Sequence, residues 1–350
     1  MSFRSERCGK YILRPALPSD NGDIRDIFES GSFSGGLNVQ FLRGASPLSS
    51  FEADGDCAHI LAAEDTETGR VIAVGGAVIQ TLYLDGAPAR CAYLTGLKVR
   101  HDYRGRLAFI PRAYGITGQL VSDCAVTYTT ILDGNTGVIK MLEKRRKNMP
   151  EYRYIGHYTT FCLGRGKPVI RVETDDMTGF DEITELHFSK KSLAPCDTAY
   201  AGFGNKRFYC VRDGSGKIAA CCFIGDQSAT KHYRLCSYGG IYRLASHFPT
   251  ALFGYPAFPK AGGMIKNGIV SYLYVRGNDP ALCGKFLRSA AYRSGFPMLL
   301  WGGFENDPLC DAVGKMRCVR YGSRLYEVLW NGESDAHIGG GVVGMEAALL

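Results

Sequence analysis

The chain has 350 residues, of which 45% are hydrophobic and 21% are charged, as is usual for a packed globular protein. Because this length exceeds one typical core, we expect two domains. The 41 basic and 34 acidic residues leave a net charge of +7 that is not gathered in a tail. The densest basic run, Lys140 to Lys147, lacks the interleaved aromatic residues of a nucleic-acid patch, which argues against a nucleic-acid-binding protein. We expect a solvated helix face there, with attraction of a polyphosphate as the functional alternative.

The cysteines and the apolar runs indicate in which cellular compartment we expect the protein. Thirteen cysteines are scattered without any CxxC pair, a pattern that favours free thiols in a reducing cytosol and predicts no metal site. The first residues, Met1 to Leu13, lack the apolar core of a secretion signal. No stretch reaches the ~18 apolar residues that span a bilayer. We therefore expect a soluble cytoplasmic protein without a membrane partner.

The first half of the chain predicts a series of strands and helices. Residues 11–28 predict a strand and an amphipathic helix, and residues 59–79 are two apolar runs around an Asp/Gly turn, typical of a β-hairpin. A buried strand, YLTGLKVR, then ends at Arg100. Pro111 indicates the first turn of the next helix, because proline loses no hydrogen bond at that position. A strand, an Asn-capped helix and a Tyr-rich strand complete the half within residues 126–144 and 152–163.

The second half repeats this order of elements. A strand and helix, a hairpin, a strand that ends in Val-Arg, a strand with a helix, and a Tyr-rich strand follow one another within residues 168–187, 207–225, 271–276, 297–316 and 319–330. Six elements in matching order indicate a duplication. We expect domains at residues 1–165 and 166–332, joined by the Gly/Pro-containing linker 164–168, and a C-terminal tail at residues 333–350.

An insertion between Cys222 and Val275 distinguishes the second half. It is rich in Tyr, Phe, Gly and Pro. Aromatic loops of this kind form binding surfaces at domain junctions, and they also form ordinary surface packing. The residues leave both interpretations open.

The segment VRHDYRGRLAFIPRAY, Val99 to Tyr114, carries the strongest chemical signal. A pyrophosphate needs inward-pointing N–H donors and a positive field, and a basic glycine turn at a helix N-terminus supplies both. Arg104, Gly105 and Arg106 are placed accordingly. Thr95-Gly96 predicts a bulge in the strand before this turn, because glycine inside a strand often marks one.

The order of elements, together with LKVRHDYRGRLA and DGNTGVIKMLEK, resembles the Gcn5-related N-acetyltransferase family, and the two halves resemble its tandem branch, which includes the N-myristoyltransferase-like fold. The resemblance implies an α/β (α+β) fold of two domains, each a mixed, mostly antiparallel sheet flanked by helices. It also implies an acyl-CoA-dependent N-acyltransferase, most simply an N-acetyltransferase that uses acetyl-CoA. The acceptor would be a small-molecule or peptide amine. The cofactor-binding residues that it implies are Leu97, Lys98, Val99, Arg104, Gly105, Arg106, Leu107, Ala108 and Asn135.

The sequence departs from the family at the catalytic positions. Tyr93 stands where many members carry a Glu base, Leu142 where many carry a Tyr acid, and Leu107 where the loop usually has glycine. We expect Tyr93 and Tyr128 to line the cleft, one positioning a water and the other donating a proton, with core packing as the alternative. Asn135 is expected to cap its helix and also to contact the cofactor.

The second half lacks a basic glycine loop. RGNDPALCGKFL follows Val275, and Asp279 would repel a pyrophosphate, so we expect this half to keep the fold and not the cofactor. Three alternatives stay open: an acyltransferase for longer or aminoacyl chains, a non-catalytic acyl-CoA sensor or scaffold, and a nucleic-acid binder, which has the least support. The residues select neither an acceptor nor an oligomeric state.

Overall fold

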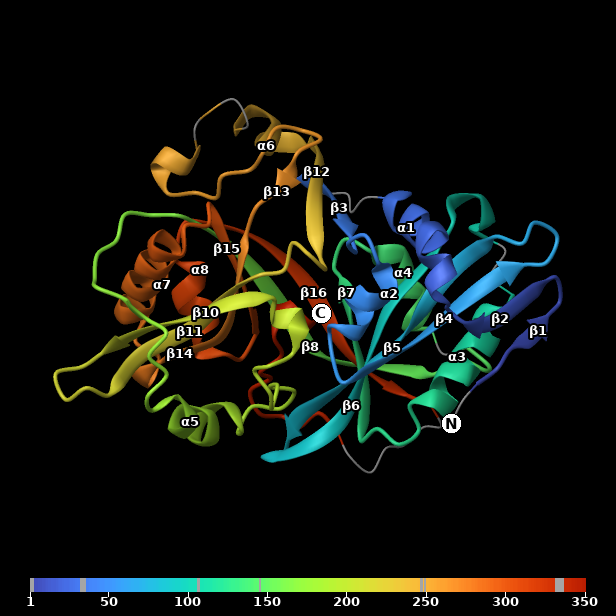
Figure 1. Ribbon diagram of the computed structural model, residues 1–350, viewed down its shortest axis with the longest axis horizontal. Coiled ribbons are helices and arrows are strands. Elements are labelled where there is room, and N and C mark those ends of the chain that lie inside the picture. Colours follow the sequence, from blue (N-terminus) through green and yellow to red (C-terminus); the bar gives the residue numbers. More distant parts are fainter. Residues whose placement is uncertain are drawn as a thin grey trace.

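The computed structural model describes residues 3–31, 36–105, 108–144, 146–245, 248, 250–330 and 337–350. One thirteen-stranded sheet passes through both halves of the chain, with helices on both faces (Figure 1). Its strand order is β1-β2-β4-β5-β6-β7-β16-β8-β15-β14-β11-β10-β9. Among the described pairs only β6–β7 and β14–β15 are parallel. The expected mixed, mostly antiparallel α/β architecture is confirmed.

The first half contains the predicted elements in their predicted order, together with β1, β3 and α2, which were not predicted. Ile24, Ile27 and Phe28 form the buried side of its first helix, at helical spacing. Pro111 lies in the first turn of α3, as expected. The elements are β1 (Glu6–Cys8), β2 (Tyr11–Pro15), α1 (Asn21–Glu29), β3 (Leu37–Leu42), α2 (Pro47–Glu52), β4 (Cys57–Asp65), β5 (Val71–Leu84), β6 (Ala87–Val99), α3 (Ile110–Leu120), β7 (Val126–Leu132), α4 (Thr136–Leu142) and β8 (Glu151–Gly164).

The second half follows the same order, except that β12, α6 and β13 are inserted and that β1, β3 and α2 have no counterpart. Its elements are β9 (Glu173–Thr174), α5 (Phe180–Ile183), β10 (Asn205–Arg212), β11 (Ile218–Asp226), β12 (His232–Tyr238), α6 (Gly240–Ala245), β13 (Met264–Ile265), β14 (Gly268–Val275), α7 (Pro280–Ser294), β15 (Met298–Phe304), α8 (Pro308–Gly314) and β16 (Cys318–Leu329). Short 3-10 turns lie at Pro18–Asp20, His101–Tyr103, Ala201–Phe203, Thr250–Phe253, Arg276–Asn278 and Ala347–Leu349, and a π-helical turn at Thr184–Phe188.

The two halves exchange their last strands. β16, which ends the second half, pairs with β7 of the first half. β8, which ends the first half, pairs with β15 of the second. The two exchanged strands also pair with each other along their whole length. The halves therefore share one continuous sheet at the centre of the molecule.

Helices cover the two faces of this sheet because side chains alternate along each strand. In β5, Ala77 and Ile79 pack in a cluster with residues of α4. Val74 and Val78, which alternate with them, pack in a cluster with residues of α1. The α1 and α4 layers consequently lie on opposite sides of the first half.

The insertion of the second half forms a small sheet with a strand of the first. β12 pairs with β3 on one side and with β13 on the other. The remainder of the insertion exposes Leu244, Phe248 and Phe253, whose relative accessibilities are 70%, 67% and 60%. The insertion thus serves as packing at the junction and also presents an apolar surface. No helix in the described part of the chain is long and apolar enough to cross a membrane.

The segment expected to be a tail is buried instead. Ile338, Val343, Met345 and Leu349 are each no more than 5% exposed. Gln80 Nε2 donates a hydrogen bond of 3.1 Å to the Leu349 carbonyl, so the segment enters the middle of the fold, where Figure 1 marks the C end. Its apolar residues explain this position, because they complete cores that the sheet leaves open.

β6 and β7 pair only where β7 begins, opposite the middle of β6. Their register joins Cys91 to Val126 and ends at Tyr93 with Tyr128, although every residue of both strands is described. β6 also has one more residue than β5 between the pairs Thr95–Gly76 and Lys98–Val74. Gly96, with φ of +72°, lies in that extra stretch. The expected bulge at Thr95-Gly96 is confirmed.

A buried ion cluster joins the halves beneath this region. Asp54 is 2.8 Å from Arg43 Nη1 and 2.7 Å from Lys231 Nζ. None of the three residues is more than 4% exposed. Lys231 also donates to the carbonyls of Ala348 and Leu350, at 3.0 and 2.8 Å. Burial lowers the pKa of Lys231 to about 8.

Asp54→Ala should destabilise the fold strongly, since it leaves two buried cations without their shared carboxylate. We expect a loss of about 3–5 kcal/mol in the free energy of unfolding, measured with urea. Asp123→Ala is the matched control, because Asp123 pairs with Arg90 at 3.1 Å while both side chains are about half exposed; it should cost no more than about 1 kcal/mol. Similar losses in both variants would contradict a buried cluster.

Gly96→Ala should destabilise more than Gly86→Ala. Both glycines have positive φ, of +72° and +84°, which should cost about 1–2 kcal/mol for alanine. A Cβ on Gly96 would also lie 2.6 Å from Phe51 Cζ, whereas one on Gly86 meets nothing within 4 Å. Overpacking should add about 1–3 kcal/mol at Gly96 alone, as measured by urea unfolding. Equal costs would show that Phe51 does not define the bulge.

Candidate functional site

The open end of the β6–β7 pair places the predicted strand residues beside a gap. Leu97 is 48% exposed, and Lys98 and Val99 are half-buried. Where the two strands first separate, Thr129 Oγ1 donates to the Leu94 carbonyl at 2.8 Å. Beyond that bond, β6 has no further backbone pairing with β7.

The loop after β6 leads directly to the N-terminus of α3. Arg104, Gly105 and Ala108 are exposed, and Gly105 has φ of +95°. Arg106 and Leu107 lie outside the described residues. Phe109 occupies the N-cap position and makes no side-chain capping bond, so no side chain of the cap competes for the first N–H groups of the helix.

Two neighbours of this loop hold it in place. Tyr103 donates its hydroxyl to Asp65 at 2.9 Å. Arg100 pairs with Asp23 and also donates to the Val71 carbonyl. These bonds fix the base of the loop and leave Arg104 at its exposed end.

Lys98 and Arg104 bring two positive charges together. A Cβ on Gly31 would lie 3.6 Å from Arg104 Nη2 and 3.7 Å from Lys98 Nζ. Lys98 donates to the Phe28 carbonyl at 2.6 Å. Burial, followed by the nearby Arg104 charge, lowers the pKa of Lys98 to about 8. No carboxylate among the described residues forms an ion pair with Lys98 or Arg104, an arrangement that favours an anionic ligand.

Tyr93 and Tyr128 close the narrow end of the gap. They are 6% and 1% exposed, and their ring centroids are 5.2 Å apart. The Tyr93 hydroxyl lies 2.8 Å from Thr130 Oγ1, and Tyr128 donates to Gln80 Oε1 at 2.5 Å. Burial raises the pKa of both phenols. This packing favours the core alternative over the catalytic one that we expected for both residues.

Gln80 is a polar residue whose role the sequence analysis missed. It is fully buried, and its amide donates to the carbonyls of Asp54 and Leu349 at 2.8 and 3.1 Å. The signal was present, because a lone glutamine inside the apolar run of β5 requires buried partners.

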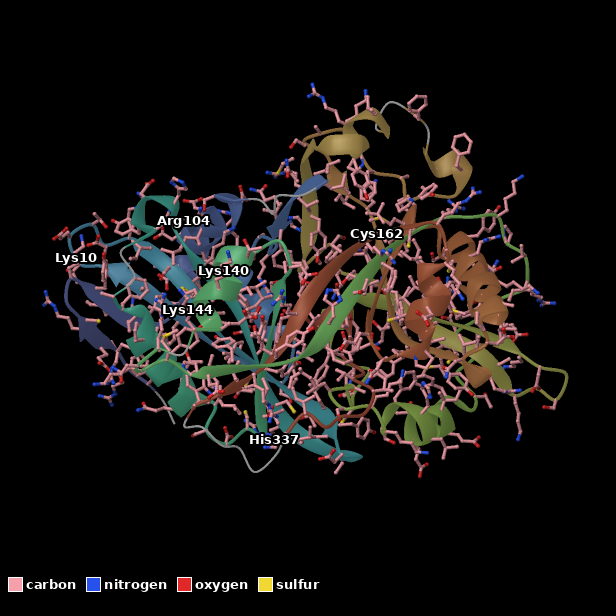
Figure 2. The ribbon with its side chains drawn as sticks, turned by 180° about the vertical axis from the view of Figure 1, so that it is seen from behind. Lys10, Arg104, Lys140, Lys144, Cys162 and His337 are labelled. Atoms are coloured by element: carbon pink, nitrogen blue, oxygen red, sulfur yellow. The ribbon has the colours of Figure 1, made fainter. Side chains whose placement is uncertain are left out.

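Asn135 and Leu142 lie on α4, next to the end of β7. Asn135 occupies the N-cap position but makes no side-chain capping bond, so the expected local cap is wrong. Its exposed amide is therefore not used by the helix. Leu142 is buried in the core and supplies no acid. Figure 2 shows Lys140 and Lys144 of this helix on the same half of the molecule as Arg104.

The loop after β14 is the second-half counterpart of the basic loop. Asp279 Oδ1 accepts from the backbone N–H groups of Ala281 and Leu282, at 2.8 and 3.3 Å. The expected turn that initiates a helix is confirmed. An internal carboxylate thus occupies the end of α7, where the first half leaves the end of α3 uncapped.

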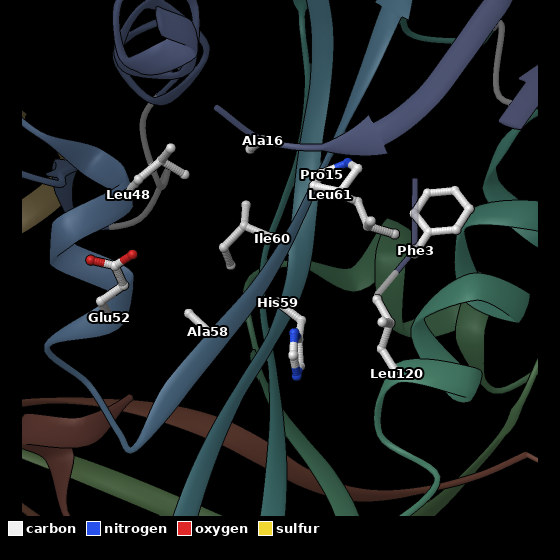
Figure 3. A pocket seen from close by; sticks show the side chains of 10 residues that line it. All are labelled: Phe3, Pro15, Ala16, Leu48, Glu52, Ala58, His59, Ile60, Leu61 and Leu120. Atoms are coloured by element: carbon white, nitrogen blue, oxygen red, sulfur yellow. The ribbon is translucent and has the colours of Figure 1, made fainter. Parts of the chain in front are cut away.

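The two described depressions lie elsewhere. One, of about 350 Å³, is open to solvent and lies beside the part of β4 that extends past the end of β2 (Figure 3). Phe3, Leu48, His59 and Leu120 are among its lining residues, and burial lowers the pKa of His59. The other, of about 390 Å³, lies beside the loop that follows β11. None of the predicted site residues lines either one.

The described residues contain no group of three His, Cys, Asp or Glu side chains that would hold a metal ion. All thirteen cysteines are free thiols. The candidate site therefore consists of the β6 edge, the exposed loop before α3, and the Lys98–Arg104 pair.

Comparison with known proteins identifies the fold. No family model and no curated protein sequence matches the chain. Among solved structures, Saccharomyces cerevisiae N-myristoyltransferase with bound myristoyl-CoA aligns with a TM-score of 0.59 at 10% identity, covering 98% of this chain and 86% of that one.

Two bacterial structures agree with this likeness. The GCN5-related N-acetyltransferase of Sphaerobacter thermophilus aligns with a TM-score of 0.52 at 12% identity, covering 94% of this chain and 99% of that one. The one from Anabaena variabilis aligns at 0.51 and 11% identity, covering 92% and 73%. The chain therefore has a GNAT-like fold of the two-half kind that N-myristoyltransferase also has.

Proposed function

We propose that the protein is an acyl-CoA-dependent N-acyltransferase whose cofactor binds to the first half, and that acetyl-CoA is its donor. The observation that carries the proposal is the unpaired edge of β6, which contains a bulge and leads to a helix without a side-chain cap, near Lys98 and Arg104, for which no carboxylate of the described residues forms an ion pair. The likeness to solved acyltransferases supports the same assignment through the fold alone.

The cofactor would use each part of this edge. The pyrophosphate would accept from the first N–H groups of α3 and lie near Arg104 and Lys98. The pantetheine arm is an extended amide chain, which can pair with the free edge of β6 as an added strand does. Asn135 would contact the cofactor from the neighbouring helix α4.

The chemistry would be a direct acyl transfer. The amine nitrogen attacks the thioester carbon, the C–S bond breaks, and the proton that the amine loses ends on the CoA thiol. A backbone N–H among Leu97 to Val99 would hold the oxyanion, and one such donor is typically worth about 3–4 kcal/mol. Tyr93 and Tyr128 as water-positioning and proton-donating groups stay predictions.

The same two tyrosines bear on the length of the acyl group. Their rings fill the end of the gap where β6 and β7 meet, and both are almost fully buried. This arrangement leaves the transferred group close to the bulge, which supports a short acyl chain over a long one. The amine acceptor, a small molecule or a peptide, would approach from the exposed side of Leu97.

Arg104→Glu should abolish tight binding of acetyl-CoA, because it places a negative charge where the pyrophosphate is expected. Isothermal titration calorimetry with acetyl-CoA measures this directly, with myristoyl-CoA as the long-chain comparison. Lys285→Glu on α7, an exposed residue of the second half, is the matched control and should bind as the native protein does.

Unchanged binding by the Arg104 variant would exclude this loop as the phosphate site. Tighter binding of myristoyl-CoA than of acetyl-CoA would contradict the short-chain proposal. Binding without release of free CoA, for any amine in a panel of polyamines, aminoglycosides and peptides, would favour the acyl-CoA sensor or scaffold over the enzyme.

Acetyl-CoA affinity should fall as the pH rises above about 8, the pKa of Lys98. Only the protonated amine attracts the pyrophosphate, and bound phosphate raises this pKa, so the loss is at most about tenfold per pH unit between the two values. Calorimetry from pH 7 to 9.5 measures it. The acetyl-CoA affinity of Lys98→Arg should stay high and should not change over this pH range. The affinity of Lys98→Met should be low and should also not change with pH. The same slope in Lys98→Met would show that another group titrates.

A further inference from the structure

The second half has its own bulge at the equivalent point of its parallel pair. β14 and β15 pair only through Gly268–Leu299 and Ile269–Leu300. β14 then has one more residue than β11 between the pairs Ser271–Phe223 and Tyr274–Cys221. Tyr272 lies in this stretch with φ of +51°.

Tyr272 corresponds to Gly96 by its place in the strand. Each is the third residue before the valine that ends the strand, Val275 and Val99. A residue with a side chain rarely adopts positive φ and needs support from its surroundings. The two bulges therefore have the same backbone form, and only the second carries a side chain.

The Glu346 side chain holds the second bulge. Its Oε1 accepts the backbone N–H of Tyr272 at 2.7 Å. The Tyr272 hydroxyl donates to the Pro195 carbonyl at 2.9 Å, and its ring contacts Phe180 and Phe188 edge-on. By contrast, no side chain of the described residues accepts from the backbone N–H of Gly96.

The segment that carries Glu346 fills the gap beside the bulge. The turn Ala347–Leu349 contacts both β14 and β15. Tyr158 donates its hydroxyl to the Met345 carbonyl at 3.2 Å. Ala348 and Leu349 are buried. The space between the separated strands of the second half is thus occupied by the chain itself.

The surroundings of Glu346 favour its neutral form. Glu346 is 8% exposed, and burial raises its pKa to about 7 although the Tyr272 N–H lowers it. The ionisable groups that interact with it are Lys191, which pairs with Asp307 at 2.9 Å, and Tyr158, Tyr272 and Cys222. A neutral carboxyl that accepts from a bulge amide presents the same C=O group as an acyl donor.

We propose that the second half retains a notch for an acyl or carboxylic-acid carbonyl at the Tyr272 amide, and that Glu346 is its built-in ligand. When that side chain is shortened, the notch takes a small aliphatic carboxylic acid such as acetate or propionate. This inference concerns the second half and does not depend on acyl-CoA binding to the first.

Chemical rescue of Glu346→Ala tests the notch. The variant should have a lower Tm than the native protein, and millimolar acetate or propionate should raise its Tm in a saturable manner, as binding to the folded state alone requires. In the native protein, acetate or propionate should raise the Tm no more than chloride does at equal ionic strength. The same should hold for the surface control Glu143→Ala, since the Glu143 carboxylate is exposed beside Arg324. Benzoate, which is too large to replace a glutamate carboxyl, should not rescue.

Glu346→Gln supplies an independent readout if the alanine variant does not fold. The folded pKa of Glu346 exceeds its ordinary value of 4.5, so the native protein should lose stability as the pH rises from about 4.5 towards about 7. Glutamine keeps a neutral carbonyl, so this variant should lack that loss and should have a higher Tm than the native protein at pH 8.

Two results would overturn the proposal. One is a Tm for Glu346→Gln that is as low as that of Glu346→Ala at every pH. The other is a response of Glu346→Ala to acetate that only equals the response of Glu143→Ala. Failure of the acetyl-CoA experiments on Arg104 would leave both readouts unaffected, so the two proposals are tested separately.

Discussion

A single extra residue in a strand determines the most important geometry of this protein. Because β6 is one residue longer than its antiparallel neighbour over the same span, it bends at Gly96 and cannot continue to pair with β7. Backbone N–H and C=O groups that lose a strand partner must find another partner or contact solvent. An opened parallel pair in the middle of a sheet therefore leaves backbone groups that another part of the chain, a ligand or solvent can satisfy. The basic loop follows the opened part of β6, and the two buried tyrosines lie where the opening begins.

The two halves meet this requirement in different ways. In the second half, carboxyl groups of the protein satisfy the donors: Glu346 at the bulge and Asp279 at the following helix. In the first half, the corresponding helix has no side-chain cap, and the positive groups of Lys98 and Arg104 lie near each other beside Gly31. The two halves thus contain one opening that the chain itself closes and one that no side chain of the described residues closes. The difference lies in the side chains at the two openings and in the C-terminal segment that fills the second one.

The sequence predicted the features that depend on local residues. The repeated order of elements, the bulge at Gly96, the start of α3 at Pro111 and the turn at Asp279 all follow from turn chemistry or from periodicity. The features that it missed depend on contacts between distant residues. The burial of residues 337–350 and the pairing of β3 with β12 bring together segments far apart in the chain, which no local pattern reports. Within the site, the near-complete burial of Tyr93 and Tyr128 does not follow from the sequence, because alternation along a strand does not tell which side a later segment will cover; their catalytic roles stay predictions.

Because β8 and β16 are exchanged between the halves, the first half cannot complete its sheet while the chain is still being synthesised. Residues up to Gly164 can emerge complete, yet β7 lacks its neighbour until residues 318–329 have been made. During that interval β7 is an open sheet edge, and both sides of β8 are open until β15 has been made; such edges are prone to pair with other chains. The first half therefore cannot mature independently, although it contains every residue assigned to the cofactor. The sheet beside the β6–β7 opening gains its last strand only when β16 has been made.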